Sequence, residues 1–209
     1  KLLADIRRAD FDFGLINKGD KIMVGVSGGK DSMALLYLLS IYQKFTDKDF
    51  DFTGVMLDLG FPKNNLEPIF KFAKENKIDF RVVDATNVYP ILKQHIKGDQ
   101  LPCSICSRMK KAAINRVAIE LGFKKVTFAH HNDDAIETLI MNMTHGGRLA
   151  TFSPKMFLQR SQIEFIRPLI YAREKDIISF VKEYNIPIIK STCTNDKTSQ
   201  RALFKKILA

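Results

Sequence analysis

Residues 21–32 combine three local patterns that few folds accommodate. Ile22–Val26 is a short apolar run of the kind that forms a buried strand, and Ser27–Gly29 interrupts it. An apolar helical run, Met33–Leu39, follows at once. A strand, a glycine turn and a helix in direct succession point backbone N–H groups and a helix N-terminus at an anion. The segment therefore predicts an anion-binding turn at the opening of an α/β fold.

The loop is not the common G-x-x-x-x-G-K-[ST] phosphate loop. Val24 occupies the position five before Gly29, and Asp31 follows Lys30. The sequence S-G-G-K-D-S instead resembles the pyrophosphate loop of the ATP pyrophosphatase superfamily. Such a resemblance implies cleavage of ATP between the α and β phosphates and adenylation of a substrate. The alternative is a glycine-rich turn without a ligand.

Each type of side chain in this loop suits a phosphate ligand in a different way. Lys30 adds a positive charge that gains strength as pyrophosphate departs. Asp31 is either a carboxylate favoured at a helix start or a ligand of bridging Mg²⁺. Backbone and hydroxyl donors, with glycines that allow close approach, come from Ser27, Gly28, Gly29 and Ser32.

Strands alternate with helices along the chain, which predicts a doubly wound, mostly parallel five-stranded sheet with helices on both faces. The superfamily resemblance implies the same fold, that of the adenine nucleotide alpha hydrolases. Strands are expected at Ile22–Val26, Phe52–Leu57, Phe80–Val83, Lys125–Ala129 and Ile186–Ile189, and a hairpin at Met156–Leu158 and Ile163–Ile166. Helices are expected at 1–20 (ending near Gly14), Met33–Leu39, Pro62–Lys77, 104–121, Asp133–Thr144, Arg173–Tyr184 and Ser199–Leu208. Val88–Pro102 reads as irregular, and the chain divides into an N-terminal helix, 1–20, and one domain, 21–209.

Three polar residues fall at the carboxyl ends of predicted strands. In parallel α/β sheets the ligand binds beyond these ends, so Ser27, Asp58 and His130 indicate one shared site. The residues at or beside the strand ends that we expect to line the nucleotide site are Val26, Met56, Ala129 and His130.

A second polar cluster, His-His-Asn-Asp-Asp-Ala-Ile-Glu-Thr, occupies residues 130–138. Asp134, at the start of a predicted helix, could hold Mg²⁺ or a substrate amine. The alternatives are hydrogen-bonded structural histidines and simple N-terminal caps at Asp133 and Asp134. The apolar residues at helical spacing predict the buried face of this helix: Ile136, Leu139, Ile140 and Met143.

This cluster resembles the H-H-x-x-D-x-x-E-T signature of the tRNA-modifying branch of the superfamily. His130, Glu137 and Thr138 match it, and Asp133 or Asp134 supplies the acid. Two such motifs in the right order make the resemblance specific.

Two of the three cysteines, Cys103 and Cys106, form a C-x-x-C pair at a predicted helix start, and Cys193 lies far along the chain. Three thiolates can hold three irons of a four-iron cluster, or Zn²⁺ together with a histidine. A persulfide, a transient disulfide or inert thiols are further alternatives.

P-C-S-x-C-x-R between the two other motifs looks like the tRNA 2-thiocytidine synthetase family, over about residues 5 to 195. The resemblance implies a [4Fe–4S] cluster on Cys103, Cys106 and Cys193. That family usually shows a further C-x-x-C-like segment near the distal cysteine, where this chain has S-T-C-T-N-D. The T-N-D…R tail also resembles lysidine synthetase, the sister family.

Basic residues exceed acidic ones, 33 to 23, for a net charge of +10. This balance favours a polyanionic partner, although a merely basic surface gives the same count. No apolar stretch is long enough for a membrane span, and the start of the chain lacks a signal-peptide pattern, so we expect a cytoplasmic protein. The residues that could meet tRNA phosphates are Arg108, Lys110, Lys111, Lys205 and Lys206.

Together the motifs predict an ATP-dependent tRNA sulfurtransferase that uses ATP and Mg²⁺, with tRNA and a cysteine desulfurase or other sulfur donor as partners. A homodimer is left open. A pyrimidine carbonyl oxygen would be adenylated and then displaced by sulfur, releasing pyrophosphate and AMP. The expected catalytic residues are Lys30, Asp31, Asp134, Cys103 and Cys193.

Three other activities compete with this prediction. The first is adenylation followed by attack of an amine, as in lysidine synthetase. The second is a nucleotide- or metal-binding module without turnover. The third, reductive sulfate-activating chemistry, shares S-G-G-K-D-S but leaves the 130–138 cluster unexplained.

Overall fold

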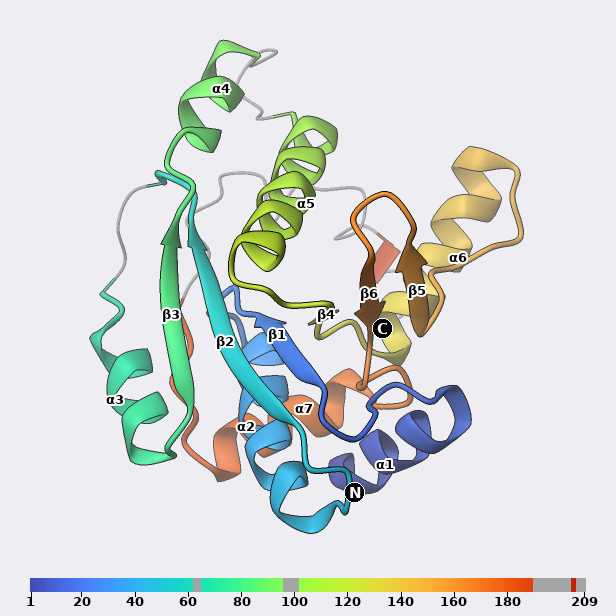
Figure 1. Ribbon diagram of the computed structural model, residues 1–209. Coiled ribbons are helices and arrows are strands. Elements are labelled where there is room, and N and C mark those ends of the chain that lie inside the picture. Colours follow the sequence, from blue (N-terminus) through green and yellow to red (C-terminus); the bar gives the residue numbers. More distant parts are fainter. Residues whose placement is uncertain (62–64, 96–101, 190–203, 206–209) are drawn as a thin grey trace.

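A computed structural model describes residues 1–61, 65–95, 102–189 and 204–205, without the side chains of residues 103 and 104. The described residues form one six-stranded sheet in the order β3-β2-β1-β4-β6-β5 (Figure 1). All neighbours pair in parallel except β5 and β6. The strands are β1 (Lys21–Gly25), β2 (Asp51–Asp58), β3 (Asp79–Asp84), β4 (Lys125–Thr127), β5 (Lys155–Leu158) and β6 (Ile163–Ile166).

Helices cover both faces of the sheet (Figure 1), which confirms the predicted fold class. They are α1 (Leu2–Phe13), α2 (Lys30–Phe45), α3 (Glu67–Glu75), α4 (Val88–Gln94), α5 (Cys103–Glu120), α6 (Asn132–Gly146) and α7 (Glu174–Glu183). Side chains alternate along each strand, so Ile22 and Val24 of β1 face the helices α1, α2 and α7, whereas Met23 faces α5. Every one of these three side chains is fully buried.

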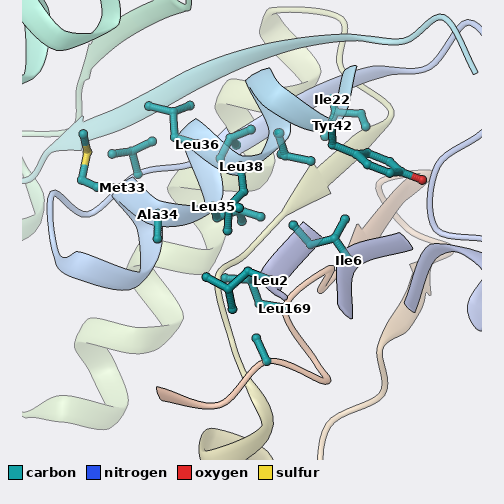
Figure 2. Close-up of a cluster of buried hydrophobic side chains, with 14 of the residues drawn as sticks. Leu2, Ile6, Ile22, Met33, Ala34, Leu35, Leu36, Leu38, Tyr42 and Leu169 are labelled. Carbon is teal, nitrogen blue, oxygen red and sulfur yellow. The ribbon is translucent and has the colours of Figure 1, made fainter. Parts of the chain in front are cut away.

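The larger core lies between β1 and the helices α1 and α2. Figure 2 shows Leu2 and Ile6 of α1 meeting Leu35 and Leu38 of α2. Gly14 ends α1 in the left-handed conformation, at φ 57°, as the sequence predicts. The division of the chain into an N-terminal helix and one domain stays a prediction.

The strand count differs from the prediction at the hairpin. Its two strands are β5 and β6, and β6 joins the sheet beside β4 instead of standing apart. Ile163, Phe165 and Ile166 are at most 1% exposed, so this strand buries residues on both of its faces. A strand inside the sheet is covered on both faces, which explains this burial, whereas a hairpin outside the sheet would leave one face exposed.

The predicted strand Ile186–Ile189 is wrong, since this segment pairs with no strand of the described sheet. Pro187 has no N–H to donate to a ladder, and Ile188 is 55% exposed. The segment contacts the loop after β1 instead: the N–H of Ile189 donates to the carbonyl of Gly28 at 2.8 Å.

The irregular segment expected at Val88–Pro102 begins with a helix, α4. Val88 and Leu92 are four residues apart and bury together against Ala85 and α5. Pro90 stands in the first turn, where its missing N–H costs nothing. Residues 96–101, and most of the predicted helix Ser199–Leu208, lie outside the described residues. Within the described part, no helix could span a membrane.

Candidate active site

The sheet order places a topological switch point between β1 and β4. From β1 the chain moves outward to β2 and β3, and then returns to place β4 on the other side of β1. The loop that begins at Ser27 follows β1, and His130 and His131 follow β4. Ligands of doubly wound sheets bind in the crevice at such a point. The two motifs of the sequence therefore meet at this crevice.

The loop after β1 is held by its own two serines. The hydroxyls of Ser27 and Ser32 are 3.1 Å apart, and the Ser32 hydroxyl donates to the carbonyl of Gly29 at 3.0 Å. Gly28 has φ +81°, a conformation that favours glycine. A Cβ added there would lie 3.3 Å from Met56 Cε and 3.3 Å from Ile189 Cβ. The loop is thus held by its own hydrogen bonds and closely surrounded.

Lys30, the first residue of α2, is held by two carboxylates. Its ammonium lies 2.9 Å from Asp31 and 2.8 Å from Oε1 of Glu174, the first residue of α7. Burial favours the neutral lysine, but the hydrogen bonds to Glu174 and Asp31 outweigh it and raise the pKa of Lys30. Lys30 is therefore a charged group fixed at the mouth of the loop.

Asp134 meets the loop through His131, which is 2% exposed. His131 caps α6 in a capping box: its Nδ1 accepts from the Asp134 N–H, and the Asp134 carboxylate accepts from the His131 N–H. The other ring nitrogen, Nε2, is 3.7 Å from Asp31 Oδ1. The sequence singled out His130, but the residue between Asp31 and Asp134 is His131.

Three helix N-termini converge at this crevice. Lys30 begins α2 and contacts Glu174, which begins α7. The N–H of Glu174 in turn donates to the Asp133 carboxylate of the first turn of α6 at 2.8 Å. Helix N-termini carry partial positive charge and N–H donors without partners in their own helix, so their convergence favours an anion. Sequence reasoning missed Glu174, because no motif surrounds it.

The residues predicted to line the site take different places around the loop. Val26 and Met56 are buried, at 5% and 8% exposure, and Ala129 packs against the same core. His130 turns toward aromatic rings, 5.1 Å from the ring of Phe152. The guanidinium of Arg167 also lies over the ring of Phe152, 4.9 Å from the ring centre. Burial lowers the pKa of Arg167.

The predicted buried face of α6 is wrong at two of its four residues, and the other two, Leu139 and Ile140, are half-buried. Ile136 and Met143 are 44% and 50% exposed, whereas Glu137 is 4% exposed. The first turn of α6 is tied to the start of α7, and its later turns run out beyond β5 (Figure 1). Anchoring at the first turn turns the Glu137 side of the helix inward, against the hydrophobic periodicity.

The C-x-x-C pair lies in the first turn of α5, as the sequence predicts. Cys106 is half-buried and packs against the cluster of Ala85, Val88 and Leu92. A helix N-terminus favours a thiolate, so Cys106 suits a metal or cluster ligand. The side chain of Cys103 and all of Cys193 lie outside the described residues.

The predicted basic patch separates into two parts. Arg108, Lys110 and Lys111 are exposed on α5, as a surface for a polyanion requires. Lys205 instead pairs with Glu174 beside the loop. Lys206 lies outside the described residues.

A hollow of about 510 Å³ opens at the opposite edge of the sheet, where β1 and β4 begin. Lys125 stands there, 5% exposed, and pairs with Asp20 and with Glu164. Lys125 is the first residue of β4 and so lies away from the carboxyl ends where such sheets bind ligands. We therefore interpret the cluster as a structural ion pair and place the chemistry at the switch point.

A family model described as a PP-loop domain matches residues 6–208. The chain belongs to the PP-loop family. Its curated relatives include the tRNA-cytidine(32) 2-sulfurtransferases of Nitrosospira multiformis and Idiomarina loihiensis. The first is 38% identical over 94% of this chain and 66% of the relative, and the second 38% over 100% and 69%. The chain therefore spans about two thirds of the length of these relatives.

Among solved structures, the chain resembles the U34-tRNA thiolase NcsA from Methanococcus maripaludis with its [4Fe-4S] cluster. The TM-score is 0.80 at 24% identity, over 99% of this chain and 70% of that one. A phosphoadenylyl-sulfate reductase from Candida auris matches with a TM-score of 0.53 at 16% identity, over 90% and 81%. At these identities the likeness concerns the fold.

Proposed function

We propose that this chain carries the ATP-dependent activity of a tRNA sulfurtransferase, with a tRNA cytidine as the base that is thiolated. The observation that carries the proposal is the convergence of three helix N-termini on the S-G-G-K-D-S loop, with Lys30 fixed among them. A tRNA cytidine as the substrate is supported by the curated relatives, which are tRNA-cytidine(32) 2-sulfurtransferases.

The first half of the reaction is adenylation of the base. The loop would bind the pyrophosphate part of ATP, with backbone N–H groups and the hydroxyls of Ser27 and Ser32 as donors. The pyrimidine carbonyl oxygen attacks the α-phosphorus, the bond to the bridging oxygen breaks, and pyrophosphate leaves. Lys30 would stabilise the charge that develops on pyrophosphate. Catalysis would thus come from positioning and electrostatics.

Asp31 and Asp134 are the residues that would hold Mg²⁺. Both lie around His131, within 3.7 Å of its ring nitrogens. Mg²⁺ binds one or two carboxylates together with phosphate oxygens, and this pair offers that set. When bound, the ion would supply positive charge that neutralises the phosphates.

The second half of the reaction replaces AMP by sulfur. Cys103, Cys106 and Cys193 would hold a [4Fe–4S] cluster, which when bound supplies an open iron for sulfide. Zinc on the same thiolates is the lesser alternative. Sulfur attacks the activated carbon, the carbon–oxygen bond breaks, and AMP leaves with the oxygen.

The remaining partners follow from this chemistry. Sulfur would come from a cysteine desulfurase or another sulfur donor, and two electrons from a thiol would release persulfide sulfur as sulfide. The tRNA would reach the site over the basic residues of α5. We place the protein in the cytoplasm, where tRNA and ATP are both present. A homodimer is left open.

The test is a product assay with the protein, Mg-ATP, tRNA transcript and sulfide. Pyrophosphate and AMP should accumulate in equal amounts, and only when tRNA is present. Lys30→Met should abolish both products, whereas Lys44→Met, the same change at an exposed lysine of α2, should not. ADP as the product, or no turnover with any tRNA, would contradict the proposal.

A further inference from the structure

Glu174 joins the nucleotide loop to α7 and to Lys205. Its Oε1 lies 2.8 Å from the ammonium of Lys30, and the same oxygen pairs with Lys205. The side chain is 15% exposed, and that of Lys30 is 28% exposed. The contact is therefore withdrawn from the solvent that weakens surface ion pairs.

The position of Glu174 is fixed through its backbone as well as its carboxylate. Its N–H donates to Asp133 Oδ2 at 2.8 Å, which ties the start of α7 to the start of α6. The segment before α7 is also joined to the start of α6, since the N–H of Asn132 donates to the carbonyl of Ala172 at 2.9 Å. The carboxylate therefore reaches Lys30 from a backbone that is held on the far side of the crevice.

The neighbours of Glu174 also determine the charge of its carboxylate. Burial opposes ionisation of Glu174, but hydrogen bonds from Lys205 and Lys30 outweigh it and hold its pKa at about 2. Glu174 is thus an anion at any physiological pH. An ammonium has three donors: two carboxylates fix the ammonium of Lys30 in space, and a phosphate oxygen can take the third.

We propose that Glu174 is the positioning residue of the nucleotide site: it holds Lys30 over the loop and brings Lys205 to the same place. It acts through Lys30 and not on the substrate. With both lysines around one carboxylate, two positive charges flank the position of the departing pyrophosphate. This inference rests on the proposed function, because it takes ATP to be the ligand of the loop.

The experiment measures the dissociation constant of Mg-ATP by equilibrium titration of the full chain. Glu174→Gln keeps the shape of the side chain and removes its charge, and should weaken ATP binding roughly tenfold to a hundredfold. Glu174→Asp keeps the charge and should recover part of the loss. The control is Glu183→Gln, at the exposed last residue of the same helix, which should leave the constant unchanged.

A double-mutant cycle separates positioning from a structural role. In a Lys30→Met background, Glu174→Gln should add little to the loss of ATP affinity, because the group it positions is gone. Additive losses would show that Glu174 acts by another route. Unchanged or tighter ATP binding by Glu174→Gln would overturn the proposal, since the carboxylate would then be inert or compete with phosphate for Lys30.

The two levels of inference fail in different ways. If the wild-type protein binds ATP but yields no pyrophosphate, the proposed function fails while the affinity cycle still reports on Glu174. If turnover is normal in Glu174→Gln and ATP affinity is unchanged, the positioning role fails and the proposed function stands. If Glu174→Gln unfolds, the dissociation constants of Mg-ATP for Glu174→Asp and Lys205→Met are compared with that of the wild type instead.

Discussion

His131 Nε2 lies 3.7 Å from Asp31 Oδ1, so one buried ring joins the loop after β1 to the start of α6. Its Nδ1 accepts the N–H of Asp134, so Nε2 is the ring nitrogen that carries a proton. That N–H faces the carboxylates of Asp31 and Asp134. The ring thus lies between both acids that we assign to Mg²⁺.

Replacing His131 should separate its two tasks. His131→Ala removes the cap of α6 and should lower the free energy of unfolding by about 1–2 kcal/mol. His131→Asn keeps a capping side chain and should recover most of that stability. Both variants should weaken Mg-ATP binding, because neither reaches Asp31. Urea unfolding and ATP titration measure the two effects, with the exposed His95→Ala as control. Normal ATP affinity in His131→Asn would sink this assignment.

The two glycines of the loop should respond differently to alanine. Gly28 has φ +81° and neighbours at 3.3 Å, so Gly28→Ala should cost about 1–2 kcal/mol of stability and distort the loop. Gly29 has φ −76°, and an added Cβ would meet only Ser27 Oγ, at 3.5 Å. Gly29→Ala should therefore change stability by less than about 0.5 kcal/mol.

ATP titration of the same pair tests the close approach of phosphate. If Gly29→Ala is stable yet binds ATP weakly, the ligand needs the space above this glycine. Equal stability of the two variants would contradict the strain that we assign to Gly28.

The local parts of the site could be predicted from the sequence because their signals are local. Strand, turn and helix around Ser27–Ser32 follow one another, and the parallel sheet brings the ends of β1 and β4 together. The sequence predicts the two strands of the hairpin. Their place in the sheet depends on burial of both faces of β6, which is a contact between distant segments. The apolar run Ile186–Ile189 predicts a strand, but Pro187 within it has no N–H to donate to a ladder.

Contacts between distant segments carried no such signal. Glu174 is an ordinary helix-start carboxylate in the sequence, and only the packing of α2 against α7 brings it to Lys30. His131 and His130 are adjacent, so their pattern cannot tell which one turns inward. On α6, the anchoring of its first turn overrides the hydrophobic periodicity of Ile136 and Met143.

The cysteines should affect sulfur transfer without affecting ATP binding. Protein purified without oxygen should contain about four irons per chain and absorb visible light. Cys106→Ser should lose most of the iron, because a ligand is missing from the first turn of α5. ATP affinity should stay unchanged, and thiolated tRNA should disappear. The control is Ser107→Ala, at the exposed neighbouring position.

Two results would decide against the cluster. An iron-free, colourless protein made with full iron supply would remove it. Turnover that is unaffected by Cys106→Ser would favour an amine nucleophile in place of sulfur.

Stability at high pH should depend on the buried pair of Tyr42 and Asp10. The Tyr42 hydroxyl donates to Asp10 Oδ2 at 2.7 Å, and Asp10 is 1% exposed. Burial and this hydrogen bond raise the pKa of Tyr42 to about 12. The fold therefore favours the protonated phenol, and its stabilisation is complete below pH about 10 and is lost as the pH rises through about 12.

Tyr42→Phe removes this hydrogen bond and should cost about 1–3 kcal/mol at pH 8, because the acceptor is a buried carboxylate. The difference in unfolding free energy between wild type and variant should shrink between pH about 10 and about 12. Urea unfolding at several pH values measures it, with Tyr184→Phe at an exposed ring as control. A difference that stays constant up to pH 12 would show that folding does not raise the pKa of Tyr42. Asp10 would then anchor α1 through the Ile16 N–H and Lys48 alone.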